Sequence, residues 1–412
     1  MMNKKNLYVL LFHLLLYFPL ASQTNNSLSS SPYSLYGLGD KNQTSTGKIN
    51  TLGGFGFAFK TATEINLLNP ASYAAIDGNS FFFDLGFRGQ TETISDTENS
   101  NREITANFSN IAFAFALNKK SGIGFSLTPY TNVGYSLSGK ESNIEGSSDT
   151  YTTDAFGEGG LNDVKINYGY LINKDVSLGI SASYLFGKIT QTEVNYFPDN
   201  ILQIEDANYY SAFSFGIGLQ YQYSPKLSFG SIINLPVSLK GNQTSTVTQV
   251  YADAEVYDND LDNFKLPLEF GIGFINAINE NFTINGDYKR SFWTDTNQSD
   301  YFGSYINQDS FGVGLQYQTQ KSDLNYLNTI EYRTGFHFDN GNLLIDNSRI
   351  NNYRYNLGLG LPLSKNSNSM LNINYSYGIK GKASNTLVKE TYHLLSLNFS
   401  FEGIWFQQRK LN

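Results

Sequence analysis

Apolar and polar residues alternate with a period of two along most of this chain. The segment 210–223, YSAFSFGIGLQYQY, places one apolar series on one side of an extended chain and serine, glycine and glutamine on the other. The apolar series is Phe213, Phe215, Ile217, Leu219 and Tyr221. Segments 111–117, 311–318 and 395–401 repeat the pattern. It predicts β-strands with one apolar face and one small or polar face.

Fourteen segments show this character, each near the ~10 residues that a tilted transmembrane strand needs. The predicted ranges are 80–94, 104–117, 122–134, 164–172, 176–192, 208–223, 226–235, 265–277, 281–292, 309–320, 328–338, 352–361, 370–379 and 391–403. Short turns, such as NKKSG from Asn118, alternate with long polar loops, the largest at 138–163 and 240–264. This sorting of loops by length favours a transmembrane barrel over a soluble sandwich.

The predicted fold is therefore an all-β, antiparallel, 14-stranded transmembrane barrel over residues 80–406, followed by a short periplasmic tail at 407–412. Hydrocarbon offers no hydrogen-bond partner to backbone groups, so the sheet must close on itself. We expect the short turns in the periplasm and the long, acidic loops outside the cell.

The first residues resemble an export signal. Lys4 and Lys5 precede an apolar run at 7–20, which is short for a membrane-spanning helix, and we expect a signal peptide at 1–22. The 412-residue chain contains no cysteine, which excludes a lipid-modified N-terminus, a disulfide, a cysteine zinc site and a thiol nucleophile. The predicted location is the outer membrane of a Gram-negative bacterium.

Residues 23–79 precede the first strand and do not alternate. They are too rich in apolar side chains for a solvated tail, so we expect a hatch that plugs the barrel lumen. The candidate ligand contacts in this segment are Phe55, Phe57, Phe59, Leu67 and Leu68.

A hatch segment with NLLNPASYA, followed by alternating strands, resembles the FadL-like outer-membrane proteins. The match to that family's Asn-Pro-Ala motif is Asn69, Pro70 and Ala71. The segments SPYSLYGLGD at 31–40 and FEGIWFQQRK at 401–410 resemble the Bacteroidota version of the family. The resemblance implies a plugged 14-stranded barrel that takes up fatty-acid-like or aromatic molecules and releases them sideways through a kinked third strand.

The third predicted strand contains Pro129, with Gly134 close by. Proline withholds a ladder donor and occurs at strand edges or bulges, so this pair is the candidate lateral-opening kink. The alternative is that Pro129 only marks where the strand leaves the membrane.

Other functional classes receive little support. Enzymatic activity is not expected, because the chain offers few histidines as a general base: only His337 and His393 follow the predicted signal segment. The net charge of −8, without a basic stripe, argues against nucleic-acid binding. Asp258, Asp260 and Asp262 resemble part of a calcium loop, but Asn263 replaces its glycine, so we expect neither a metal site nor a cofactor.

Two functions from different classes remain. The first is passive uptake of hydrophobic small molecules, with lateral release through the barrel wall. The second is an accessory, non-transporting barrel within an outer-membrane assembly or export complex. The expected partners are outer-membrane lipid, a hydrophobic ligand in the first case and other outer-membrane proteins in the second.

Overall fold

The computed structural model describes residues 31–42, 45–62, 64–250, 252–300, 303–319, 326–364, 367–384 and 387–404. The predicted signal peptide and the predicted tail at 407–412 lie outside these ranges. In the described part of the chain, no helix is long and apolar enough to cross a membrane.

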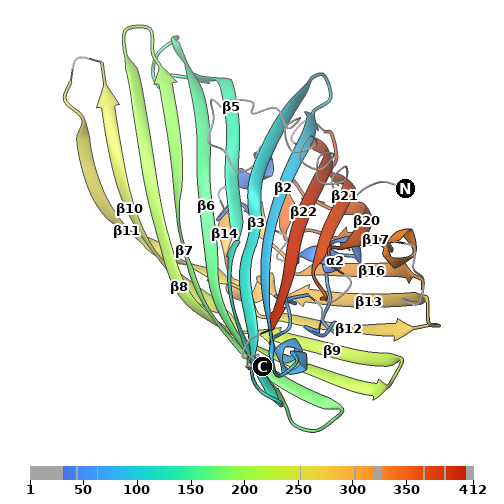
Figure 1. Ribbon diagram of the computed structural model, residues 1–412. Helices are drawn as coiled ribbons and strands as arrows, with labels where there is room; N and C mark the ends of the chain where they lie inside the picture. The colour runs from blue at the N-terminus through green and yellow to red at the C-terminus, as the bar shows by residue number, and fades with distance from the viewer. Residues whose placement is uncertain are drawn as a thin grey trace, which may run out of the picture.

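The main sheet is a closed antiparallel barrel of fourteen strands, as predicted (Figure 1). Pairing of the first strand with the last, from Ser80 with Ile404 to Ser95 with Lys389, closes it. The strands are β2 (Ser80–Ser95), β3 (Ser100–Asn118), β4 (Ser121–Pro129) with β5 (Thr131–Asn143), β6 (Thr150–Leu171), β7 (Val176–Tyr196), β8 (Ile201–Ser224), β9 (Leu227–Asn234) with β10 (Val237–Gln249), β11 (Glu255–Leu266) with β12 (Glu269–Ala277), β13 (Phe282–Ser291), β16 (Gln308–Gln318), β17 (Glu331–Asp339), β20 (Asn352–Pro362), β21 (Met370–Gly381) and β22 (Lys389–Ile404).

Three barrel strands are each broken into two pieces next to a proline. β4 ends at Pro129, Pro236 lies between β9 and β10, and Pro267 lies between β11 and β12. Proline cannot donate to a ladder, so regular pairing stops there. β8 spans the second break, because its first half pairs with β10 and its second half with β9.

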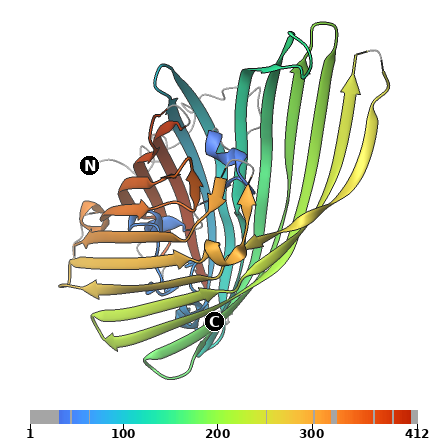
Figure 2. The same cartoon turned by 180° about the vertical axis from the view of Figure 1, so that it is seen from behind.

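The two predicted long loops at 138–163 and 240–264 are wrong as loops. They form the hairpins β5–β6 and β10–β11, and the neighbouring strands β7 and β8 are also long, at 21 and 24 residues. These strands rise together beyond the other strands (Figures 1 and 2). We call residues 137–158, 188–209 and 240–263 the sheet extension.

Both faces of the sheet extension carry polar side chains, which explains why alternation did not reveal it. One face carries a chain of side-chain hydrogen bonds that runs from Gln191 through Asn208 to Gln243. The other face carries Thr190 and Thr192, one residue away along the same strand. Backbone pairing between neighbouring strands is sufficient to hold such strands in water.

A small second sheet lies beside the sheet extension and consists of β14 (Ser299–Asp300), β15 (Gly303–Tyr305), β18 (Leu343–Ile345) and β19 (Ser348–Arg349). The 3-10 turn η3 (Trp293–Thr296) lies in the same connection as β14 and β15, whereas η4 (Tyr326–Thr329) lies between β16 and β17. Trp293 stacks on Tyr305 with ring centroids 5.0 Å apart. Both belong to a buried cluster with Leu38, Tyr135 and Leu239, which joins the small sheet, the first residues and the barrel wall.

Residues 31–79 contain η1 (Pro32–Leu35), β1 (Asp40–Lys41), α2 (Gly47–Thr51) and η2 (Pro70–Ala75). They pack against the inner faces of the barrel strands, where glycine provides room. An added Cβ at Gly218 would lie 2.0 Å from Asn69 Oδ1, and one at Gly230 would lie 2.0 Å from the Phe57 carbonyl oxygen. Gly218 belongs to β8, and on the opposite, outer face of that strand the side chain of Phe213 is 70% exposed.

We predict that Gly218→Ala destabilises the protein by displacing the 31–79 segment. The new methyl group overlaps the Asn69 side chain, and overpacking of this kind costs about 1–3 kcal/mol. The measurement is thermal or urea unfolding in detergent, with Gly78→Ala as the control because that position has no atom within 4 Å of an added Cβ. Equal stability of the two variants would contradict the tight contact.

Candidate functional site

The Asn-Pro-Ala motif anchors residues 31–79 to the barrel wall. Asn69 caps η2, because its Oδ1 accepts a hydrogen bond of 3.0 Å from the Ala71 amide. Its Nδ2 donates to the Phe57 carbonyl at 2.7 Å and to the Leu219 carbonyl of β8 at 3.2 Å. Pro70 occupies the first position of η2, where its missing N–H has no cost. The motif therefore has a structural role in these contacts.

The glycine-rich stretch at 51–59 forms a tight turn against the opposite wall. Gly53 and Gly54 have φ values of +88° and +78°, which favour glycine. The Gly53 carbonyl oxygen lies 3.0 Å from His337 Nδ1 on β17. The Phe55 ring packs against the same imidazole in a tilted arrangement, with ring centroids 5.1 Å apart.

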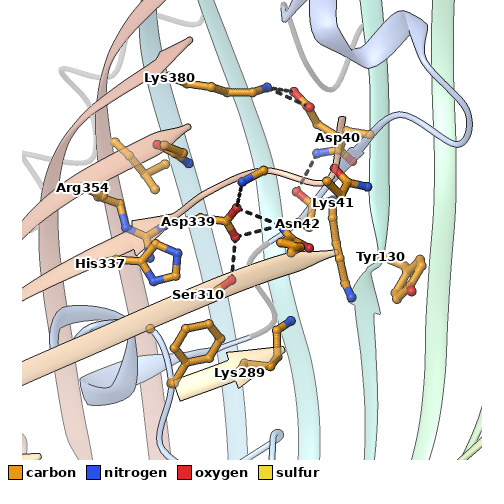
Figure 3. Close-up of a pocket in the computed structure, with 18 of the residues that line it drawn as sticks. Asp40, Lys41, Asn42, Tyr130, Lys289, Ser310, His337, Asp339, Arg354 and Lys380 are labelled. Atoms are coloured by element: carbon orange, nitrogen blue, oxygen red, sulfur yellow. Dashed lines mark hydrogen bonds and ion pairs between the residues drawn. The ribbon is translucent and has the colours of Figure 1, made fainter. Parts of the chain in front are cut away.

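A cavity of about 360 Å³ lies between residues 31–79 and the barrel wall (Figure 3). Of the predicted ligand contacts, Phe55, Phe57, Leu67 and Leu68 line it. Phe59 is not among the lining residues and packs with Ile49 and Leu52. The role of these residues in binding a ligand stays a prediction.

Charged side chains from the barrel strands form a second part of the lining. They are Arg88, Glu92, Asp163, Lys165, Glu269, Lys289, Asp339, Arg354, Lys380 and Glu390, joined by Asp40 and Lys41 of β1. Inward charges of this kind are visible in the sequence as basic or acidic positions between apolar ones, as with Arg354 between Tyr353 and Tyr355. Sequence analysis missed them as a site because only closure of the barrel brings them together.

Ion pairs connect β1, in the 31–79 segment, to the barrel wall at two places. Lys380 Nζ lies 2.8 Å from Asp40 Oδ2 and 3.3 Å from Glu390 Oε2, and Ser31 Oγ donates to Glu390 at 2.5 Å. Burial, reinforced by the negative charge of Glu390, raises the pKa of the nearby Tyr33 hydroxyl to about 12.

The second group of ion pairs between the first residues and the wall involves Glu269. Its Oε1 lies 2.6 Å from Lys41 Nζ and 3.3 Å from Lys289 Nζ, and it accepts a hydrogen bond of 3.1 Å from Ser291. The cavity thus contains several paired charges beside an apolar part of the lining that includes Phe55, Ile232 and Leu394.

The wall is interrupted between β3 and β5. β4 pairs with β3 and β6, whereas β5 pairs with β6 and β1 in the described part of the chain. Pro129 is the last residue of β4, and Gly134 donates its amide to Ser34 Oγ at 3.0 Å. The lining of the cavity beside the interruption includes Arg88, Asn107 and Asn132. Release of a ligand through this place stays a prediction.

The remaining sequence candidates lie apart from the cavity or have simple contacts. His393 is on the outer side, 2.7 Å from the Tyr375 hydroxyl. Asp258, Asp260 and Asp262 are exposed on β11, where Asp258 accepts a hydrogen bond from Thr244. Across the described residues, no group of three or more His, Asp or Glu side chains is placed to hold a metal ion.

The closed barrel with its plugged lumen has the fold of FadL-like outer-membrane proteins. Solved structures with this fold include the toluene transporter TodX of P. putida, with a TM-score of 0.64, 14% identity and coverage of 89% of this chain and 100% of that chain. Another is the CymD monoaromatic hydrocarbon channel, with a TM-score of 0.60, 16% identity and coverage of 89% and 100%. A Pseudomonas aeruginosa FadL homologue has a TM-score of 0.59, 11% identity and coverage of 88% and 98%.

The sequence model of the BamG family matches residues 2–412, so the chain belongs to the BamG family. No curated protein matches the sequence.

We predict that Lys380→Met destabilises the protein and loosens the first residues. The substitution leaves Asp40 and Glu390 without their shared cation, and loss of one partner of a buried ion pair costs about 3–5 kcal/mol. The measurement is thermal unfolding in detergent, combined with the rate of proteolysis after residue 30. Lys119→Met, at an exposed turn, is the control. Unchanged proteolysis in Lys380→Met would mean that this ion pair does not hold the segment.

Proposed function

We propose that this chain is an accessory barrel subunit of an outer-membrane protein assembly. The observation that carries the proposal is the character of the lumen. Residues 31–79 occupy it, and the remaining cavity is lined by ion pairs and amides among its apolar side chains. Pockets for apolar ligands are mostly apolar with few polar groups, so this lining suits a hydrophobic cargo poorly.

The sheet extension supports the same proposal. A tilted transmembrane strand needs only about 10 residues, and the strands of the sheet extension continue well beyond the other barrel strands (Figure 2). Residues 137–158, 188–209 and 240–263 contain fourteen Asp and Glu residues and three lysines, which gives a net charge of −11 against −8 for the whole chain. A partner with a basic surface would complement it.

Two further assignments belong to the proposal. We place the sheet extension outside the cell, because transmembrane barrels keep their short turns in the periplasm. We also retain the Bacteroidota version of the family as an expectation, which rests on the segments at 31–40 and 401–410.

The test is native mass spectrometry of the protein extracted gently from its own outer membrane. We expect a reproducible assembly with other outer-membrane proteins, because an accessory subunit remains bound to its partners. Association through the sheet extension should weaken when ionic strength rises, since salt screens exposed charges beyond about 10 Å at 0.1 M. A protein that purifies alone under every mild condition contradicts the proposal.

The double variant Asp260→Lys with Asp262→Lys should reduce recovery of the partners at least tenfold by reversing charge on exposed β11. Its control is Glu98→Lys with Glu280→Lys, which has the same change of charge at exposed positions away from the sheet extension. Quantitative mass spectrometry of the copurified proteins is the measurement. An equal loss in both variants would show that the position of the charge does not matter.

Uptake of hydrophobic molecules is the second candidate. It is favoured by the interruption between β3 and β5, which the cavity reaches at Asn107 and Asn132, and by the fold shared with hydrocarbon channels. In this case Pro129→Ala, by promoting continuous pairing, should lower uptake of labelled toluene or oleate by cells severalfold. Pro236→Ala, at another strand break, is the control. Uptake equal to that of cells lacking the protein excludes transport of these two probes.

A further inference from the structure

Arg354 is a buried cation in the cavity wall. The side chain is 7% exposed, and its Nε and Nη2 atoms have no hydrogen-bond partner among the described residues. It projects from the inner face of β20 and lines the cavity next to His337 (Figure 3). A buried guanidinium without an anion is costly, so its presence requires an explanation.

The acidic groups that share the cavity have other partners. Asp339 accepts hydrogen bonds from Gln308 at 2.8 Å, from Ser310 at 2.7 Å and from the Gly341 amide at 2.7 Å. Glu390 is bound by Lys380 and Ser31, as described above. No described carboxylate lies within ion-pair distance of Arg354, so its positive charge faces the cavity.

The surroundings of Arg354 leave room on one side only. Across the sheet it is opposite His337 on β17 and Gly378 on β21. The space at Gly378 is filled by the ring of Tyr392, which would lie 2.1 Å from an added Cβ. On the lumen side, Gly54 and Phe55 line the same cavity. A group bound by Arg354 would therefore lie between the wall and the glycine-rich turn.

We propose that this cavity binds a small oxyanion, a carboxylate or a phosphate or sulfate group, on the Arg354 guanidinium. Guanidinium is planar and donates two parallel hydrogen bonds to such groups. The ligand is small and polar, because the cavity measures about 360 Å³ and paired charges surround it. By contacting both β20 and the turn at Gly53–Phe55, the anion would hold the 31–79 segment against the wall.

This inference does not depend on the accessory role. An anion that stabilises the lumen is compatible with an assembly subunit and with a transporter, and failure of either functional test leaves it intact. Conversely, absence of anion binding leaves the partner-capture experiment unaffected.

The experiment measures binding of radiolabelled phosphate and sulfate to the purified full-length protein in detergent, at constant ionic strength set with chloride. We expect about one site per chain and a rise in the unfolding temperature with added anion. Arg354→Gln should weaken binding at least tenfold and abolish the rise. Arg290→Gln is the control, because Arg290 is a more exposed arginine, paired with Asp309 at 3.1 Å, and is not among the residues that line the cavity.

Competition by acetate and succinate distinguishes a carboxylate site from a phosphate or sulfate site. If carboxylates alone bind and stabilise the protein, the ligand is a small carboxylate. Should Arg354→Gln fail to fold, Arg354→Lys keeps the charge and the wild-type temperature shift remains measurable. The proposal is overturned if none of the four anions binds or stabilises the wild-type protein, or if a folded Arg354→Gln binds as the wild type does.

Discussion

Backbone hydrogen bonding inside the bilayer is the constraint on which this structure depends. Every N–H and C=O group at membrane depth needs a partner within the protein, which forces the strands into a closed wall. Closure by β2 and β22 creates a lumen, and the small inward residues of the strands make that lumen wide. The 31–79 segment can be irregular because it lies within this wall, where backbone and side chains such as Asn69 provide its hydrogen bonds.

The interior of the barrel combines ion pairs with apolar packing. Lys380 and Glu269 each join the first residues to the wall through an ion pair whose wall member is largely buried and whose partner, Asp40 or Lys41, is partly exposed. Such pairs contribute little net stability compared with apolar packing, but breaking one is costly. This favours one position of the segment over others, and it places charged groups beside the apolar side chains of the cavity.

Prolines mark the places where three strands of the barrel wall are each divided into two pieces. Pro129 lies where β5 separates from β3, while Pro236 and Pro267 lie where the tall strands β10 and β11 change direction into β9 and β12. Each break interrupts a ladder locally, and the neighbouring strand maintains continuity, as β8 does beside Pro236. The barrel thereby keeps continuous pairing on both sides of the breaks.

The sequence by itself determined the barrel, because the alternation in segments such as 210–223 follows directly from the two faces of a strand between lipid and lumen. It also indicated the irregular segment before Ser80. It could not reveal the hairpins at 137–158 and 240–263, since both faces of those strands meet water and the period of two disappears. Only the tertiary structure assembled the charged cavity, because Asp40, Glu269 and Lys380 are distant in sequence and meet only when the barrel closes around the first residues.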